Sequence, residues 1–405
     1  MAMILGGAAT QDEVRRNNLS SLLRLVHARG ATSRAELATA TGLNRSTVKL
    51  LTADLVQAGL VRELAPVGRG GSGRPSITVA PEHTRIFVLG LDIGVEHLTV
   101  VLVGLGGQVL ARQHLEQSPE DFDVTRTLGR LQLLTDQVLA QAGPPGVCVG
   151  LGVAVCGVVS AEDGVVRFAP NLGWVDVPLR DLLARQYGSA LRIAIGNDGD
   201  LGAIAEHLRG AAIGRSTLVY ISGEVGIGGG VILADRLMTG SGGYAGEIGH
   251  MSIDPRGRLC RCGRRGCWET EIGDQAVLES TGAPLGSHLL DVLVAYAAGE
   301  QWPRAGMRRV GRALGLGVAN LVNIFNPQTI VFGGVSRHIF LATEPHVREV
   351  MADALVAPRE GLTLEVAGLG EDSTVLGAAE LAFGPLLADP LGVLAEVLNQ
   401  IGTPA

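Results

Sequence analysis

The sequence predicts an α/β protein in which a small helical unit precedes a larger body of alternating strands and helices. Apolar residues near the N-terminus repeat with helical spacing, whereas apolar strands further along the chain end in polar residues and alternate with helical stretches. Glycine is abundant at 58 of 405 residues, as in α/β proteins with glycine-rich ligand loops. With 46% hydrophobic residues, the chain can form cores for more than one domain.

Charge is distributed unevenly along the chain. Residues 12–74 contain ten Lys or Arg and five Asp or Glu, which gives +5, and the remainder contains 23 and 35, which gives −12. A basic N-terminal part on an acidic body is typical of proteins that bind a polyanion, most often nucleic acid. Ordinary surface arginines would give the same count, so charge alone does not decide the partner.

The sequence predicts a cytoplasmic protein without a membrane partner. The N-terminal residues lack the basic start and long apolar core of a secretory signal. The most apolar run, residues 146–159, is too short and too rich in glycine to span a bilayer. The chain has 5 cysteines, an odd number, and a cluster among them favours a metal site in a reducing compartment over a disulfide framework.

The head, residues 12–81, has the pattern of a helix-turn-helix. Ser33 and Glu36 form a capping box that opens a second helix, Gly42 ends that helix, and Asn44 can cap a third. The apolar positions with helical spacing are Leu19, Leu22, Leu23 and Val26 in the first helix and Val48, Leu51 and Leu55 in the third.

The start of the third helix is predicted to enter a major groove of DNA. Two strands follow, joined by a glycine-rich arm suited to phosphates or to a narrow minor groove, so that the head resembles a winged helix-turn-helix. The predicted DNA-binding residues are Arg45, Ser46, Thr47 and Lys49 in the helix and Arg69 and Arg74 in the arm. The alternative is a three-helix module for protein interaction, but helix pattern, charge and arm together favour DNA.

The body begins with the apolar strand "RIFVLGLDIG" and a hairpin that turns at Gly106. A helical stretch near residues 123–142 and an apolar strand at 147–155 follow, and a further strand leads into Asn197 and Asp198. Ligands of α/β sheets lie beyond the carboxyl ends of the strands, so Asn197 and Asp198 are candidates for a binding site.

Three cysteines and a histidine have the pattern of a zinc site. The motif Cys260-x-Cys262-Gly-x-x-Gly-Cys267 begins ten residues after His250, and its glycines allow the tight turns that bring the sulfurs to one ion. Three thiolates and one imidazole match a closed tetrahedral zinc site. Because four protein ligands leave no open position, we expect one structural Zn²⁺ per chain.

These motifs resemble the signature of the ROK family of repressors and sugar kinases. The resemblance rests on "CRCGRRGCWE" after "AGEIGH", and on "GLDIG", "PNLGW", "GND", "GIGGG", "NPQTIVFGG" and "LGAAELA". It implies an actin/hexokinase-like body with a first lobe at 86–198 and a second lobe at 199–372. A C-terminal helix at about 373–386 should return to the first lobe.

The head places the chain with the repressor branch, which is similar to regulators of xylose, glucose or N-acetylglucosamine use. The resemblance implies a sugar-responsive transcriptional repressor that binds a monosaccharide between its lobes. A homodimer or homotetramer would bind an inverted-repeat operator DNA. Residues 388–405 could form a short amphipathic helix to which the sequence assigns no role.

The resemblance also implies the sugar-binding residues. They are Asn171, Asn197, Asp198, Glu247, His250 and Glu269. Amides and carboxylates suit sugar hydroxyls, which both donate and accept hydrogen bonds. His250 would bind zinc through one ring nitrogen and donate toward the sugar through the other. For Asn171 and Glu269, loop or helix capping is the alternative.

The two phosphate loops depart from those of the family's kinases, which resemble D-I-G-G-T and G-T-G-I-G-G-G. The first loop has Val95 and Glu96 after its glycine, and the second has Glu224 and Val225. Like charges about 4 Å apart repel by roughly 4 kcal/mol at an intermediate dielectric, so a triphosphate should bind poorly. We therefore expect no enzyme activity, with Asp198 a vestigial base that accepts a hydrogen bond from the sugar.

Two alternatives stay open at this point. One is an ATP-dependent sugar kinase with a DNA-binding head. Magnesium or a nearby arginine would favour this alternative, because either would offset the charge of the two glutamates. The other is a regulator whose signal is a protein partner and whose sugar pocket is vestigial.

Overall fold

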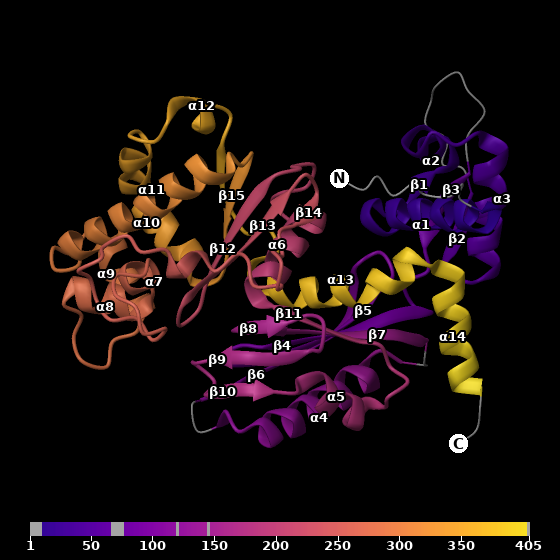
Figure 1. The fold of residues 1–405 in the computed structure, drawn as a ribbon, viewed down its shortest axis with the longest axis horizontal. Helices are drawn as coiled ribbons and strands as arrows, with labels where there is room; N and C mark the ends of the chain where they lie inside the picture. Colours follow the sequence, from indigo (N-terminus) through magenta and orange to yellow (C-terminus); the bar gives the residue numbers. More distant parts are fainter. Residues whose placement is uncertain (1–9, 66–76, 119–120, 144–145, 403–405) are drawn as a thin grey trace, which may run out of the picture.

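The computed structural model describes residues 10–65, 77–118, 121–143 and 146–402 (Figure 1). Arg69 and Arg74 of the predicted DNA-binding arm lie outside the described residues.

The head consists of helices packed on a small antiparallel sheet with the strand order β1-β3-β2. The helix boundaries follow the expected caps: the Ser33 side chain accepts from the backbone N–H of Glu36, and Gly42 adopts φ 70° at the end of its helix. Asn44 Oδ1 accepts from the backbone N–H of Thr47 at 2.8 Å. The elements are α1 (Gln11–Arg29), β1 (Thr32–Ser33), α2 (Arg34–Thr41), α3 (Arg45–Gln57), β2 (Val61–Leu64) and β3 (Thr78–Pro81).

The first large sheet has the strand order β11-β7-β4-β5-β6, in which β11, β7 and β4 are parallel and β5 and β6 are antiparallel. Helices α4 and α5 cover one of its faces (Figure 1). The elements are β4 (Ile86–Ile93), β5 (His97–Gly104), β6 (Gln108–Glu116), α4 (Val124–Gln141), β7 (Val147–Val155), α5 (Leu179–Tyr187) and β11 (Ile193–Asn197). A small sheet of β8 (Val158–Ser160), β9 (Val165–Ala169) and β10 (Trp174–Val177) adjoins it.

The second large sheet has the order β14-β13-β12-β15-β16, with an antiparallel β12–β13 hairpin and parallel β12, β15 and β16. Its strands are β12 (Leu218–Gly223), β13 (Ile227–Leu233), β14 (Arg236–Leu237), β15 (Thr329–Phe332) and β16 (Thr363–Val366). The helices of this part are α7 (Glu269–Ile272), α8 (Asp274–Thr281), α9 (Leu289–Ala297), α10 (Arg304–Phe325), α11 (Gly334–Met351) and α12 (Val356–Arg359). The hairpin end of β12–β13 faces the first sheet (Figure 1).

Two helices lie between the large sheets. Helix α6 (Asp198–Arg209) packs on β12 and β13, and α13 (Ser373–Ala388) packs on β4 and β7 and also against α6. The close approach of the two helices needs small residues: a Cβ at Gly377 would lie 1.9 Å from the carbonyl oxygen of Leu201. The two helices therefore connect both sheets as one packed layer.

The C-terminal residues form α14 (Pro390–Gly402), which packs against β7, α13 and α1 of the head. Buried residues of α1 share one apolar cluster with α13 and α14, so the head is docked on the body rather than joined to it only through the chain. Among the described residues, no single helix has the length and apolar character to cross a membrane. Residues 370–388 and 390–400 meet those criteria only as a pair bent by 103°.

Candidate functional site

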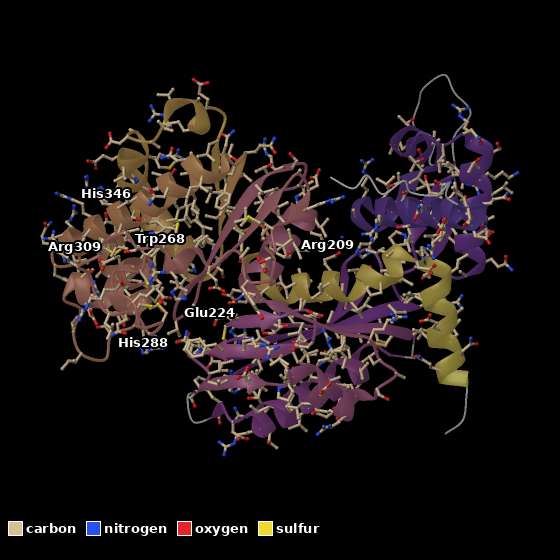
Figure 2. The ribbon with its side chains drawn as sticks, viewed as in Figure 1. Arg209, Glu224, Trp268, His288, Arg309 and His346 are labelled. Carbon is tan, nitrogen blue, oxygen red and sulfur yellow. The ribbon has the colours of Figure 1, made fainter. Side chains whose placement is uncertain are left out.

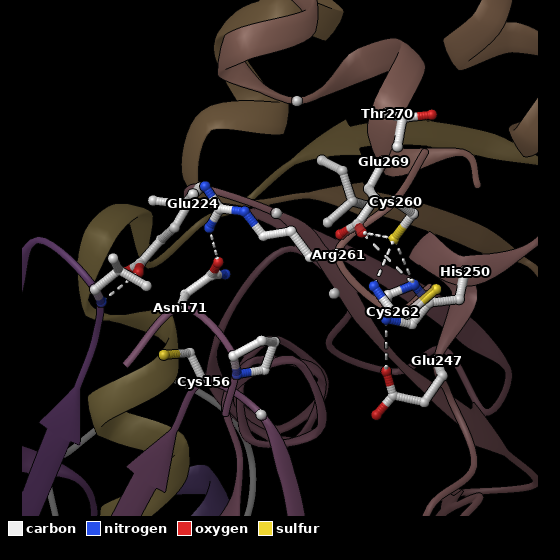
Figure 3. A pocket seen from close by; sticks show the side chains of 18 of the residues that line it. Cys156, Asn171, Glu224, Glu247, His250, Cys260, Arg261, Cys262, Glu269 and Thr270 are labelled. Atoms are coloured by element: carbon white, nitrogen blue, oxygen red, sulfur yellow. Dashed lines mark hydrogen bonds and ion pairs between the residues drawn. The ribbon is translucent and has the colours of Figure 1, made fainter. Parts of the chain in front are cut away.

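A cavity of about 560 Å³ lies where the ends of the first-sheet strands face the β12–β13 hairpin and the cysteine segment. Its volume is in the range of sites for small molecules. The six residues expected to contact sugar all line it: Asn171, Asn197, Asp198, Glu247, His250 and Glu269. The polar side chains converge from opposite walls (Figure 3). Residues that are 98 positions apart in the sequence, from 171 to 269, thus meet at one site.

Asn197 forms the N-cap of α6. Its Oδ1 accepts from the backbone N–H groups of Gly199 and Asp200, at 2.8 and 3.2 Å, and its Nδ2 donates to the carbonyl oxygen of Gly157 at 2.9 Å. The cap fixes the start of α6, and with it the position of Asp198.

Asp198 is half-buried at the first position of α6, where it lines the cavity. Burial, followed by the nearby carboxylates of Glu224 and Asp92, raises its pKa to about 8. The carboxyl group therefore carries its proton at neutral pH and can donate a hydrogen bond as well as accept one. Sequence reasoning expected an acceptor only. Burial also raises the pKa of Glu247 on the opposite wall.

The cysteine cluster has the geometry of a four-ligand metal site. The ligand atoms of His250, Cys260, Cys262 and Cys267 all lie within 4.8 Å of one another. The Cys262 and Cys267 sulfurs are 3.6 Å apart, and Cys260 Sγ lies 3.7 Å from His250 Nδ1. Ligands about 2.3 Å from a tetrahedral ion are about 3.7 Å from one another, so the cluster can hold a metal ion with little movement.

The backbone around the cluster is held by tight turns and by the core. Gly263 and Gly266 have φ of 87° and 68°, and a Cβ at Gly266 would lie 1.5 Å from the carbonyl oxygen of Asp254. Trp268 is fully buried and donates from its indole N–H to the carbonyl oxygen of Ala313 at 2.8 Å. The cysteine segment is thereby anchored on α10.

His250 and Glu269 connect the cluster with the cavity. His250 Nδ1 faces Cys260, whereas Nε2 lies 3.9 Å from Glu247 Oε2 (Figure 3). Cys260 Sγ donates to Glu269 Oε1 at 2.7 Å. Metal binding needs the thiolate of Cys260 and would remove its hydrogen bond to Glu269, so a metal ion at the cluster would fix His250 and not Glu269.

The phosphate loops of the two large sheets are joined to each other by Glu224. Its Oε2 accepts from the backbone N–H of Val95 at 3.0 Å, and its Oε1 lies 3.2 Å from His97 Nδ1. His97 Nε2 lies 3.2 Å from Asp92 Oδ2 on its other side. Burial alone would lower the pKa of His97, but Asp92, Glu224 and Glu96 raise it to about 9. His97 is therefore a cation between two carboxylates at neutral pH.

This arrangement corrects the expectation that both inserted glutamates face a bound triphosphate. Glu224 lines the cavity, but its charge is balanced by His97, and the side chain of Glu96 is exposed and lies outside the cavity lining. The charged group beside Glu224 is His97, which the sequence analysis did not single out. The hairpin of β4 and β5 brings His97 beside Asp92. The five-residue spacing of Asp92 and His97 across the turn was the feature of the sequence that could have predicted this pair.

Arg261 is a second residue that sequence reasoning missed. It lies between two cysteines of the cluster, lines the cavity and donates from Nη1 to Asn171 Oδ1 (Figure 3). The contact joins the cysteine segment to the loop between β9 and β10. Because the cluster fixes its backbone, Arg261 is aimed at the cavity by the residues on either side of it.

The predicted DNA-binding residues of α3 lie in the first turns of that helix. Helix α3 itself lies at the outer edge of the head (Figure 1). Arg45, Ser46 and Lys49 are exposed and Thr47 is half-buried, whereas Val48 between them is fully buried. Ser46 Oγ donates to Asn44 Oδ1 at 2.6 Å and so belongs to the helix cap. The exposed positive side chains are thus held on a rigid helix.

The model of the ROK family matches residues 88–384. The chain belongs to the ROK family. A xylose repressor from Caldicellulosiruptor bescii is 29% identical over 376 residues, which cover 88% of this chain and 93% of that protein.

Two solved ROK structures extend the comparison. A ROK transcriptional regulator, described as a homologue of the E. coli MLC protein, has a TM-score of 0.79 at 26% identity and covers 95% of this chain and 99% of that one. A ROK glucokinase from Streptomyces griseus in complex with glucose and AMPPNP has a TM-score of 0.64 at 25% identity, and covers 73% of this chain and 99% of that one. This ROK chain matches the regulator over more of its length than the kinase.

Proposed function

We propose that this ROK protein is a sugar-responsive transcriptional repressor. Its repressor-named relatives and the larger share of the chain that matches a ROK regulator support this function. The observation that carries the proposal is the cavity, where six polar residues converge beside a phosphate loop that Glu224 fills. A monosaccharide would bind between a first lobe at 86–198 and a second lobe at 199–372.

More carboxyl groups than arginines line the cavity, where the arginines are Arg258 and Arg261, and this excess favours a neutral sugar over a sugar phosphate. Asp198, Glu224, Glu247 and Glu269 line it, and the charge of Glu224 is already paired with His97. A phosphate group would face these carboxyl groups, whereas sugar hydroxyls can donate to carboxylates and accept from protonated Asp198. Xylose, glucose and N-acetylglucosamine are therefore the first sugars to test.

The ATP-dependent kinase is the second candidate, because ROK glucokinases match the body of the chain. We favour a protein without kinase activity. Glu224 accepts the Val95 N–H of the first phosphate loop, which removes one backbone donor from any phosphate, and its side chain takes space in the second loop. Val95 and Val225 add bulk that the kinase loops avoid.

The metal is proposed to be a structural Zn²⁺, held by His250, Cys260, Cys262 and Cys267. Three thiolates and one imidazole are a typical structural zinc set. The ion would hold His250 toward the sugar and would take no part in a reaction.

The head is proposed to be a winged helix-turn-helix that binds operator DNA through Arg45, Ser46, Thr47 and Lys49. The exposed cations at the start of α3 support this role. The arm residues Arg69 and Arg74 stay a prediction. A homodimer or homotetramer would bind an inverted repeat, because two-fold symmetry of the protein matches two-fold symmetry of the site.

A thermal-shift screen tests the proposal. Xylose, glucose, N-acetylglucosamine, glucose 6-phosphate and ATP are each added to the purified protein. We expect one neutral sugar to raise the Tm and ATP to leave it unchanged, since binding to the native state stabilises it. A rise with ATP and sugar-dependent ADP release would support the kinase instead. No shift with any sugar would favour a regulator that responds to a protein partner.

A further inference from the structure

Helix α6 connects the cavity with the head. Its first residue, Asp198, lines the cavity, and its last residue, Arg209, lies against His27 of α1 (Figure 2). At about 1.5 Å of rise per residue, the 12 residues of α6 span about 18 Å. The two ends of one short helix thus touch the proposed sugar site and the proposed DNA-binding head.

Arg209 meets Glu380 of α13 and His27 of α1 in a buried group that we call the junction cluster. Arg209 Nε donates to Glu380 Oε1 at 2.5 Å, and His27 Nε2 lies 2.9 Å from Glu380 Oε2. The side chains of His27 and Glu380 are each 3% exposed. Burial alone would raise the pKa of Glu380, but His27 and Arg209 bring it below its usual value. Buried charges depend on good geometry, so the cluster tolerates little displacement.

The turn between β5 and β6 completes the junction cluster. The backbone N–H of Gly106 donates to His27 Nδ1 at 2.9 Å, and Arg209 Nη1 donates to the carbonyl oxygen of Gly106 at 2.9 Å. Nδ1 therefore accepts, and Nε2 lies between Glu380 Oε2 at 2.9 Å and Arg209 Nη2 at 2.7 Å. A Cβ at Gly107 would lie 2.1 Å from Arg209 Cζ, so the turn approaches the guanidinium as closely as a glycine permits.

Helices α6 and α13 are fastened to each other near the junction cluster. Glu206 of α6 is fully buried and accepts from the backbone N–H groups of Gly368 and Leu369 and from Ser373 Oγ, at 2.9, 3.0 and 2.7 Å. Arg209 and Glu380 therefore move together when α6 moves. A displacement of α6 at its capped start would therefore be transmitted to His27 through Arg209 and through Glu380.

The other contacts between head and body are mostly apolar. Side chains of α1 pack on α13 and α14 in one cluster. Apolar contact is non-directional, so it holds the head on the body without specifying one orientation. The hydrogen bonds of the junction cluster are directional, as is the one that Ser20 Oγ of α1 donates to the carbonyl oxygen of Leu387 of α13 at 2.6 Å. Of these contacts, only the junction cluster includes a residue of α6, the helix that begins at the cavity.

We propose that His27, Arg209 and Glu380 are positioning residues through which sugar binding at the start of α6 changes the orientation of the DNA-binding head. This inference rests on the proposed function. The sugar needs only to favour one arrangement of α6, and operator DNA needs to favour one orientation of the head. The coupling between the two ligands is then reciprocal.

The test measures the operator Kd with and without saturating sugar and takes their ratio. The DNA is an operator selected by the wild-type protein from random duplexes, and the sugar is the monosaccharide that binds in the thermal-shift screen. The test variant Arg209→Met/Glu380→Gln removes both buried charges. The matched control Arg192→Met/Glu396→Gln removes an exposed Arg–Glu pair between the body and α14.

We expect the test variant to bind the sugar with nearly wild-type affinity and, in the absence of sugar, to bind the operator with nearly wild-type affinity. Sugar should no longer change its operator Kd by much, so that the ratio of the two Kd values approaches one. The control should keep the wild-type ratio. A test variant with the wild-type ratio would overturn the inference and leave the proposed function intact. A wild-type ratio of one with every sugar would instead refute the proposed function, and the inference with it.

Hydrogen exchange on the wild-type protein provides a test that does not depend on the folding of a variant. Saturating sugar should change the protection of the Gly106 amide, which donates to His27, and of amides in α1. The inference is wrong if sugar changes operator affinity while exchange at Gly106 and throughout α1 stays the same.

Discussion

The carboxylate of Glu224 accepts a hydrogen bond from the backbone N–H of Val95 at 3.0 Å, and so joins the phosphate loops of the two large sheets. In a nucleotide-binding loop such an N–H faces a phosphate. Here a side chain of the protein takes that place, and His97 balances its charge. The glycine-rich segment 222–230 thus directs the carboxylate of Glu224 to the backbone of the other loop, at Val95.

The first prediction concerns nucleotide. Glu224→Thr should gain weak ATP binding, because it frees the Val95 N–H and removes the carboxylate from the cradle. Glu96→Thr is the matched control and should gain none, because the Glu96 side chain is exposed and outside the cavity lining. Calorimetric titration with ATP measures both.

Glu224→Thr should still show little or no ADP release with any sugar. Val95 and Val225 continue to crowd the loops, and errors of about 1 Å in positioning are poorly tolerated in transition states. Efficient turnover by this variant would show that Glu224 alone separates the protein from a kinase. ATP binding by Glu96→Thr and not by Glu224→Thr would contradict the assignment of roles.

The second prediction concerns pH. The pKa of His97 is raised from 6.5 to about 9, so its stabilising contribution is fully present below pH 6.5 and is lost as the pH rises through about 9. His97→Gln should therefore lower the free energy of unfolding most below pH 6.5, on the order of 2 kcal/mol, and progressively less toward pH 9 and above.

Thermal or urea unfolding across this pH range measures the difference between wild type and His97→Gln. His83→Gln, at a histidine without an ion pair among the described residues, serves as the control for the substitution itself. A difference between wild type and His97→Gln that is constant from pH 6 to pH 10 would rule out an ionic role for His97.

The third prediction concerns the metal. Wild-type protein should contain one Zn²⁺ per chain by elemental analysis, and Cys262→Ser should lose it. Cys148→Ser, which replaces a cysteine of β7 that lies outside the cluster, should retain it. Loss of zinc should lower the Tm strongly, because metal binding and folding are coupled, and should weaken sugar binding through His250. Metal-free Cys262→Ser with normal Tm and normal sugar affinity would contradict the structural role.

The fourth prediction concerns DNA. Arg45→Ala or Lys49→Ala should weaken operator binding, and a lost phosphate contact should reduce the salt dependence of log K by about 0.9. The control Arg309→Ala removes one positive charge from α10, which is distant from the head (Figure 2). It should change neither the operator affinity nor its salt dependence. Point variants are preferable to deletion of the head, because deletion would uncover the apolar faces of α13 and α14. Unchanged operator affinity in both head variants would exclude α3 as the contact helix.

Local patterns in the sequence predicted the parts of the structure that depend on short-range physics. The caps at Ser33 and Asn44 and the turn glycines at 263 and 266 form where their spacing indicated. The convergence of the six cavity residues follows from strand ends and from the family's motifs. The side-chain amide of Asn197 can either cap a helix or contact a ligand. The sequence could not show that its Oδ1 accepts from the backbone N–H groups of Gly199 and Asp200 and so caps α6.

Contacts between distant segments could not be read from the sequence. The junction cluster joins His27, Arg209 and Glu380, which no spacing rule relates. Residues 388–405 had no assigned role, and in the structure α14 supports the head through α1. The pairing of His97 with Glu224 likewise depends on how the two large sheets face each other.

The central claim is that one chain couples sugar binding in the cavity to operator binding by the head. The most direct measurement is fluorescence anisotropy of a labelled operator duplex, titrated with wild-type protein with and without the sugar found in the thermal-shift screen. We expect the sugar to change the operator Kd by at least about fivefold, the lower range of typical allosteric coupling. An operator Kd that stays the same at saturating sugar, with sugar binding confirmed in the same sample, would contradict the claim.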